Sequence, residues 1–341
     1  MPIKFKSKIA CVALLLFGCN FVNAQEGAYN SYSPYSVFGM GDICRQGTVY
    51  NLSMGGTGIA SRNHRFINYL NPAAITARDT LSFMMDFGLV GEGKLYKQGD
   101  VKSASNLLNI SNVAFTVPIY KKSAFVAGIS PYSTMGYDFS HDITDPSLIG
   151  SVGNINYRSY GEGGVYQIFA GGAATFWNKL SVGAQFLYYF GNIDKSTIMN
   201  FSESSYRDVY SGYILNLNAI GGNFGVQYEQ ALPSGLSLTV GATYKTSSKL
   251  KGYVTDYKYA TVSSVTDTLK YKTDTLSHGS NVKLASEYGV GIALKKGDRW
   301  RAEFNYTRSD WRNSNLENVI GFANAGDARF STTYSQAVRA G

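Results

Sequence analysis

The feature that most constrains this chain is a two-residue alternation of apolar and other side chains. The segment 180–190 carries an apolar row on alternate residues, with mostly small or polar groups between them. The segments 236–244 and 300–306 repeat the pattern. Because successive side chains of a strand point to opposite faces, the alternation predicts β-strands with one apolar face. The 37 Gly, 26 Tyr and 19 Phe against only 7 Pro are typical of a fold with many strands and turns.

Extending this interpretation along the chain gives ten predicted strands. They cover residues 81–90, 110–120, 123–132, 163–176, 180–190, 219–231, 235–246, 283–295, 299–310 and 329–341. The segment 251–275 also alternates, and we expect it to form a hairpin beyond the main strands. The last strand stops in mid-pattern, which suggests a chain that lacks its final strands.

The connections between the predicted strands alternate strictly between short and long. The short links are 121–122, 177–179, 233–235 and 295–298, and the long ones are 91–109, 133–160, 191–218, 247–282 and 311–328. Short turns therefore lie at one end of the strands and long loops at the other, as in an outer-membrane barrel. We predict an all-β fold, a transmembrane antiparallel β-barrel of about 10 visible strands, up to 14 if the chain is truncated. A secreted soluble sandwich is the alternative. In the barrel, Phe186 and Phe304 should face lipid.

The N-terminus reads as an export signal. Lys4, Lys6 and Lys8 precede a short apolar run, and small residues end at Ala24, so residues 1–24 are predicted to be a signal peptide of a Gram-negative outer-membrane protein. The run is too short for a transmembrane helix. A competing interpretation is a lipobox with acylation of Cys19. Cleavage after Ala24 leaves Cys44 alone, which excludes an internal disulfide.

Charge and titratable residues exclude several classes of function. The full chain has a net charge of +8, and removing the signal leaves 28 basic and 23 acidic residues, or +5. These basic residues are scattered, so nucleic acid is not an expected partner. Only His64, His141 and His278 could serve as a catalytic base, and their acidic neighbours are those of any polar loop. We therefore predict no catalytic residues, no metal site and no cofactor.

The domain plan places a glycine-rich segment, residues 25–76, before a barrel at 77–341. We expect this segment to fill the lumen as a plug. Asn71 and Pro72 predict the start of a short helix, with Asn as N-cap and Pro at the first helical position. We expect positive φ angles at three glycines of the segment, which are Gly55, Gly56 and Gly58.

The sequence SMGGTGIA at 53–60, followed by Asn71-Pro72-Ala73 just before the first strand, resembles the FadL-type family of outer-membrane channels for long-chain fatty acids and other hydrophobic compounds. The resemblance implies a hatch inside the barrel and passive diffusion of a hydrophobic ligand, without ATP or a metal. It makes Gly55, Gly56, Gly58, Asn71, Pro72 and Ala73 the plug and gating motif. Arg62 and Arg65 are weak candidates for binding a ligand carboxylate.

Two functions remain open from the sequence. The first is a channel for hydrophobic small molecules in contact with outer-membrane lipid. The second is a barrel-anchored surface or secretion-system protein that binds protein partners through its extracellular loops, as implied by similarity to the PorV-like branch of the same fold. A continuous, partly apolar cavity in the lumen would favour the channel, and a lumen packed shut would favour the anchor.

Overall fold

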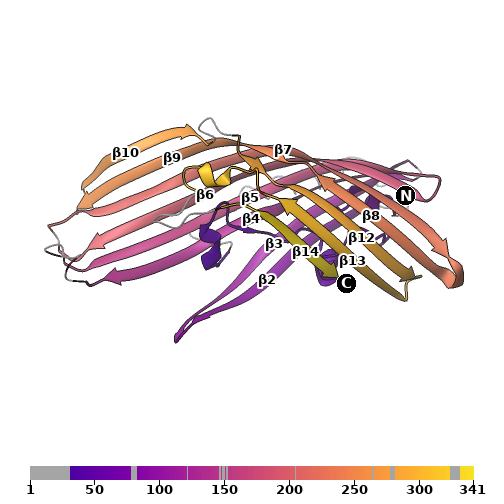
Figure 1. Cartoon of the computed structure of the whole chain (residues 1–341), viewed down its shortest axis with the longest axis horizontal. Helices are drawn as coiled ribbons and strands as arrows, with labels where there is room; N and C mark the ends of the chain where they lie inside the picture. The colour runs from indigo at the N-terminus through magenta and orange to yellow at the C-terminus, as the bar shows by residue number, and fades with distance from the viewer. Residues whose placement is uncertain are drawn as a thin grey trace, which may run out of the picture.

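The computed structural model describes residues 31–77, 83–120, 122–145, 147, 150, 153–203, 205–262, 265–276, 281–322 and 331–341. The predicted signal peptide, Cys19 and His278 lie outside these residues. Within the described residues the dominant element is one antiparallel sheet of 14 strand segments (Figure 1). The sheet is curled, and no helix of the described residues is long and apolar enough to cross a membrane.

The elements are as follows. The strands are β1 (Asp42–Ile43), β2 (Met84–Gln98), β3 (Val101–Tyr120), β4 (Ser123–Ile143), β5 (Ile155–Phe176), β6 (Leu180–Phe201), β7 (Asp208–Leu232), β8 (Leu236–Lys245), β9 (Ser248–Val262), β10 (Val265–Thr275), β11 (Lys283–Leu284), β12 (Ser286–Lys296), β13 (Trp300–Asp310) and β14 (Tyr334–Ala340). The helical turns are η2 (Pro34–Val37), α2 (Val49–Ser53), η3 (Pro72–Ala77), η4 (Pro233–Gly235) and η5 (Leu316–Asn318).

The main strand order is β14-β13-β12-β8-β7-β6-β5-β4-β3-β2. These ten strands match the ten predicted from the alternation. We call the end of the strands that holds the short turns the lower end, and the opposite end the upper end. Strand β7 is long enough to pair with β8 along its C-terminal, lower half and with β9 along its N-terminal, upper half. The predicted hairpin within 251–275 is confirmed, because β9 and β10 pair with each other from Val262↔Val265 onward.

The predicted long loops were largely wrong. Residues 91–109 continue the strands β2 and β3, which pair as far as Gln98↔Val101. Strands β5, β6 and β7 likewise extend into the predicted loops 133–160 and 191–218. The physical reason is that an antiparallel ladder satisfies the backbone hydrogen bonds of both strands wherever a hairpin can run on. The short links 177–179 and 233–235 were placed correctly, and the one predicted at 295–298 lies at 297–299.

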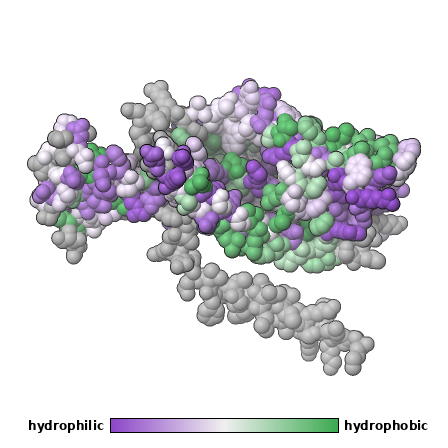
Figure 2. All heavy atoms as spheres, turned by 90° about the horizontal axis from the view of Figure 1, so that it is seen from below, coloured by the Kyte–Doolittle hydropathy of each residue, from purple (hydrophilic) through white to green (hydrophobic). Residues whose placement is uncertain are grey.

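In the lower part of the sheet, apolar side chains are exposed and polar side chains are buried, which is the reverse of a water-soluble protein. On β6, Phe186 is 52% exposed, whereas the neighbouring polar residues Ser181 and Gln185 are buried. Phe304 is 49% exposed, so both phenylalanines predicted to face outward do so. Figure 2 shows apolar residues gathered over the half of the molecule that holds the short turns, while the long arm of the strands is mainly hydrophilic. We call this exposed apolar surface the belt, and the strand portions past it the extension.

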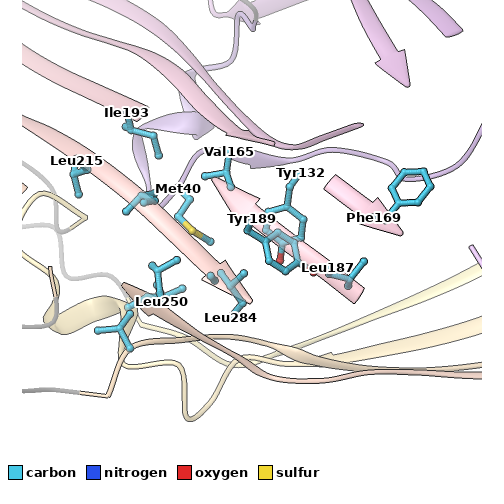
Figure 3. Close-up of a cluster of buried hydrophobic side chains, with 14 of the residues drawn as sticks. Met40, Tyr132, Val165, Phe169, Leu187, Tyr189, Ile193, Leu215, Leu250 and Leu284 are labelled. Atoms are coloured by element: carbon cyan, nitrogen blue, oxygen red, sulfur yellow. The ribbon is translucent and has the colours of Figure 1, made fainter. Parts of the chain in front are cut away.

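The opposite face of the sheet is covered by the chain's own residues. Met40, Ile67 and Tyr69 from the N-terminal segment belong to the same buried cluster as side chains of β4 to β7. Figure 3 shows Tyr132 and Tyr189 close together in this cluster, with Met40 and Leu284 nearby. Leu316, Val319 and Phe322 add a second covering segment. We call this face of the sheet the covered face.

Candidate functional site

The ladder between β3 and β4 is incomplete. These strands pair only from Tyr120↔Ser123 to Val113↔Ile129. Past that point, residues 101–112 of β3 pair with β2 alone, and the far part of β4 pairs with β5 on its other side. Figure 1 shows the β2–β3 hairpin diverging from β4 in this region. We call the resulting break in the wall of the described sheet the side gap.

The free edge of β4 at the side gap is capped by the N-terminal segment. The Ser33 N–H donates to the Gly136 carbonyl at 2.8 Å, and the Cys44 N–H donates to the Tyr132 carbonyl at 2.9 Å. Between them, β1 pairs with Ser133 and Thr134. A Cβ at Gly136 would lie 1.8 Å from the Ser31 carbonyl oxygen, so this close contact requires glycine. An edge strand that could pair with another chain is thereby occupied by residues 33–44.

Two adjoining hollows lie behind this cap. The side hollow, of about 610 Å³, lies between β2–β3, β4 and residues 32–35. The inner hollow, also about 610 Å³, lies on the covered face of β4 to β7. Both are lined by Tyr137 and Phe139, whose rings stack with centroids 5.4 Å apart. The two hollows together form a surface rich in aromatic rings that leads from the interior of the extension to the side gap. The further rings that line it are Tyr32, Tyr35, Tyr96, Tyr157 and Tyr213.

Lys195 places a cation in the inner hollow. Its side chain is largely buried, and its Nζ donates to the Val37 carbonyl at 2.9 Å. It lies above the belt, because the apolar residues on the exposed face of β6 end at Phe190 and are followed by Asn192 and Asp194. Burial lowers the pKa of the Lys195 ammonium to about 8. The other charged group of the hollow, Asp256, is paired with Lys270.

A packed layer separates the inner hollow from a lower cavity. Along the covered face of β6, Lys195 lines the inner hollow and Leu187 lines the lower cavity, while Tyr189 and Ile193 between them are 2% and 0% exposed. Tyr189 also packs edge-on against Tyr132 with centroids 4.9 Å apart. The lower cavity, of about 200 Å³, is lined mostly by polar side chains, including Lys245 and Glu287 with charged atoms 3.6 Å apart. The aromatic surface therefore leads sideways and does not continue downward.

The Asn-Pro-Ala motif lies at the lower end of the covered face. The Asn71 side-chain oxygen accepts from the Ala73 N–H at 3.0 Å, and Pro72 opens the 3-10 turn η3, as the sequence predicts. The Asn71 amide donates to the Ile59 carbonyl at 2.7 Å. At Gly183, a Cβ would lie 2.6 Å from the Pro72 carbonyl carbon, so the strand approaches the motif closely.

The glycines of the predicted motif differ in their roles. Gly55 and Gly56 adopt positive φ, 67° and 80°, as predicted. Gly58 has no positive φ, so that expectation was wrong. It is a site of close packing, since a Cβ there would meet Asn51 and Leu70 at 2.7 Å.

The two candidate arginines lie apart from the hollows. The buried Arg62 guanidinium donates to Ser181 Oγ at 2.8 Å and to Gln227 Oε1 at 3.0 Å, and it pairs with Glu229 at 3.1 Å. It fixes the N-terminal segment to β6 and β7. Arg65 is exposed and pairs with Asp298 at 3.0 Å, at the short-turn end.

Sequence reasoning missed Lys195 and Tyr137 as candidate site residues. Each is one polar or aromatic residue in an alternating strand, and nothing local distinguishes it from its neighbours. The histidines His64 and His141 are exposed. The Asp138 carboxylate near His141 pairs with Arg158 at 2.6 Å. No group of three or more potential metal ligands occurs among the residues that the structure describes.

Comparison with known proteins finds a family model that matches most of the chain. A family model described as BamG matches residues 6–339. No curated protein matches. Among solved structures, the CymD monoaromatic hydrocarbon channel is 17% identical, with 81% of this chain and 71% of that chain covered and a TM-score of 0.49. The Pseudomonas putida toluene transporter TodX is 15% identical, with 80% and 72% covered and a TM-score of 0.49. A Pseudomonas aeruginosa FadL homologue is 10% identical, with 88% and 98% covered and a TM-score of 0.32.

Proposed function

This chain belongs to the BamG family, and from that premise we propose that it is an outer-membrane β-barrel that passes hydrophobic small molecules sideways through the side gap into the bilayer. The observation that carries the proposal is the aromatic surface of the two hollows, which reaches the side gap, where β3 and β4 no longer pair. The apolar belt supports the membrane location, because so many exposed large hydrophobic side chains are unfavourable in water.

The chemistry of the route favours hydrophobic ligands. Aromatic rings offer a large apolar contact area, and tyrosine hydroxyls keep the surface wettable at its outer end. The lower cavity is polar and lies beyond a packed layer, so a hydrophobic molecule gains no comparable contacts by continuing downward. The side hollow lies above the belt, and the side gap leads from it down to Ile129. Ile129 pairs with Ile168, which pairs with Tyr188 at the upper edge of the belt. A molecule that follows the side gap downward therefore reaches the hydrocarbon of the membrane.

We assign two roles to the N-terminal segment, residues 25–76, as part of this proposal. Residues 33–44 act as the cover of the side gap, because their hydrogen bonds to β4 close its free edge. The predicted plug motif, residues Gly55, Gly56, Gly58, Asn71, Pro72 and Ala73, holds the lower end shut. Arg62 supports the same closure through its contacts with Ser181, Gln227 and Glu229.

The experiment that tests the proposed passage fills the side hollow with a large side chain. Ser103 lines it, and its hydroxyl hydrogen-bonds the Tyr32 hydroxyl at 2.6 Å. Ser103→Trp should lower the uptake of radiolabelled toluene and of oleate by vesicles that contain the protein. Ala104→Trp is the matched control, since Ala104 is exposed on the opposite face of the same strand. Equal uptake by the two folded variants and the wild type would contradict passage through the side hollow.

A second candidate function, binding of a protein partner, is favoured by the β9–β10 hairpin. Among the described strands, β10 pairs only with β9, and Leu269 and Tyr271 are 58% and 62% exposed. An unpaired edge strand can accept another strand. Replacing Leu269 and Tyr271 by serine should leave toluene uptake unchanged if the channel function is right. Loss of a copurifying protein, with uptake absent in the wild type, would favour the partner-binding function.

A further inference from the structure

An open groove of about 480 Å³ lies on the exposed face of β5, β6, β7 and β9, away from the hollows. Its aromatic wall is formed by Tyr166, Tyr188, Phe190 and Tyr253. The rings of Tyr188 and Phe190 stack with centroids 5.8 Å apart, and those of Tyr166 and Phe190 lie 6.1 Å apart. We call this feature the rim groove, because it lies where the belt ends and the extension begins.

The other wall of the rim groove carries side-chain amides. Asn192, Asn216 and Asn218 line it, and register places Asn192 opposite Asn216 on the neighbouring strand. None of the three side chains hydrogen-bonds to another residue that the structure describes. Three amides that face outward without internal partners offer both donors and acceptors to a ligand.

A cation stands beside these amides. Lys251 is exposed and lies opposite Asn218 in the β7–β9 ladder. It forms no ion pair within the described part of the chain. The nearest acid on this face of β6, Asp194, already accepts a hydrogen bond from Ser196 Oγ at 2.9 Å. The groove therefore combines aromatic rings and outward-facing amides, and Lys251 adds one positive charge beside Asn218 at its edge.

The surface immediately below the rim groove is apolar. Phe186, Ile220 and Phe224 lie on the same face at lower register and are 52%, 62% and 50% exposed. A molecule that fits both surfaces has hydrocarbon chains below and a polar, anionic head group above. Rings stack against the C–H face of a sugar, amides hydrogen-bond its hydroxyls, and an ammonium binds phosphate with a charge-assisted bond.

We propose that the rim groove is a binding site for a phosphorylated glycolipid of the leaflet next to the extension. The sugar lies between the aromatic wall and the amides, its phosphate contacts Lys251, and its acyl chains lie along Phe186, Ile220 and Phe224. This site is separate from the proposed passage, since it lies on the opposite face of the same strands. It does not depend on the protein being a channel.

The experiment measures lipid binding to the full chain in detergent micelles by native mass spectrometry. The probes are lipid A, phosphatidylglycerol, a neutral glycosyl diacylglycerol and a soluble phosphorylated disaccharide. The variants are Asn216→Leu and Lys251→Gln, with Lys258→Gln as the control, an exposed lysine farther along β9. Unheated gels show whether each variant is still folded, since a folded barrel resists unfolding there. Changes in binding can therefore be separated from misfolding.

The wild type and the control should bind lipid A about ten-fold more tightly than phosphatidylglycerol, as expected for roughly one or two added polar contacts. Asn216→Leu and Lys251→Gln should each lower lipid A affinity toward that of phosphatidylglycerol. Equal binding of all lipids by the wild type, or unchanged lipid A affinity in both variants, would overturn the proposal. Equally tight binding of the soluble disaccharide would overturn the lipid assignment.

Discussion

The two halves of β6 present opposite chemistries although they belong to one continuous strand. In the lower half, apolar side chains such as Phe186 are exposed and polar ones such as Gln185 are buried. In the upper half, Asn192 is exposed and the covered face carries Lys195 within an aromatic hollow. The change occurs within a few residues of Phe190. The difference shows that one strand exposes apolar side chains in its lower half and polar ones in its upper half. Under the proposed function, the lower half contacts hydrocarbon and the upper half contacts ligands.

Of the changes considered, a charge placed in the belt should have the largest effect, which is a loss of stability in the lower half of β6. Phe186→Lys places an ammonium in the middle of the exposed apolar face, and we expect it to cost about 2 to 4 kcal/mol of unfolding free energy in a bilayer. Asn192→Lys, a few residues along the same face, should have an effect near zero. Reversible urea unfolding in lipid vesicles measures both. Equal stability of Phe186→Lys and wild type would contradict the assignment of the belt to lipid.

Replacing the buried Lys195 tests whether the upper half of β6 contacts the ligand. Lys195 lines the inner hollow with an ammonium that would attract the carboxylate of oleate. In Lys195→Met the side chain keeps its length and loses this charge, so we expect uptake of oleate to fall by about ten-fold. Uptake of toluene, which has no charge, should stay unchanged and serves as the internal control. Equal losses for both compounds would show that Lys195 acts only in packing.

The change of oleate uptake with pH should be smaller than the loss caused by Lys195→Met, and it should require Lys195. Burial lowers the pKa of Lys195 to about 8, so the side chain is mostly protonated at pH 7 and mostly neutral at pH 9. Oleate uptake by the wild type should therefore fall several-fold across this interval. Lys195→Met should show no such fall. A wild-type profile parallel to that of the variant would contradict an attraction between the Lys195 ammonium and the oleate carboxylate.

The smallest effect is expected at the lower end. Asn71-Pro72 replaced by Ala-Ala removes the cap of η3 and its bond to the Ile59 carbonyl, while the strand ladders stay intact. We expect a folded barrel with an uptake change of about two- to three-fold, since one or two hydrogen bonds are lost. Unchanged uptake, or a general loss of folding, would count against a role of this motif in closure.

The fold could largely be predicted from the sequence because a period of two is a local signal. Phe186 and Phe304 were assigned to the correct face for this reason. The extent of the upper parts of β2 to β7 could not be predicted, since segments such as 91–109 carry polar residues on both faces and resemble a loop in sequence. Asn71 was placed correctly as a helix cap, because capping involves neighbours in the chain.

The candidate site could not be predicted, because it arises from pairing across the sheet. The side gap exists where the residues of β3 that precede Val113 do not pair with β4, and no single residue marks that point. Lys195 and Tyr137 come together from different strands, and their shared surroundings depend on register. The arginines were singled out for their charge alone. Arg62 proved to be held in an internal network, which depends on contacts with β6 and β7.

The central claim is that hydrophobic molecules leave the barrel at the side gap. The most direct test uses a photoreactive fatty acid with the protein in lipid vesicles, followed by mapping of the adducts by mass spectrometry. The account predicts adducts near Tyr96, Ser103 and Tyr137, around the side hollow. Adducts concentrated at Thr243 and Lys245 in the lower cavity, with none at the side hollow, would contradict it.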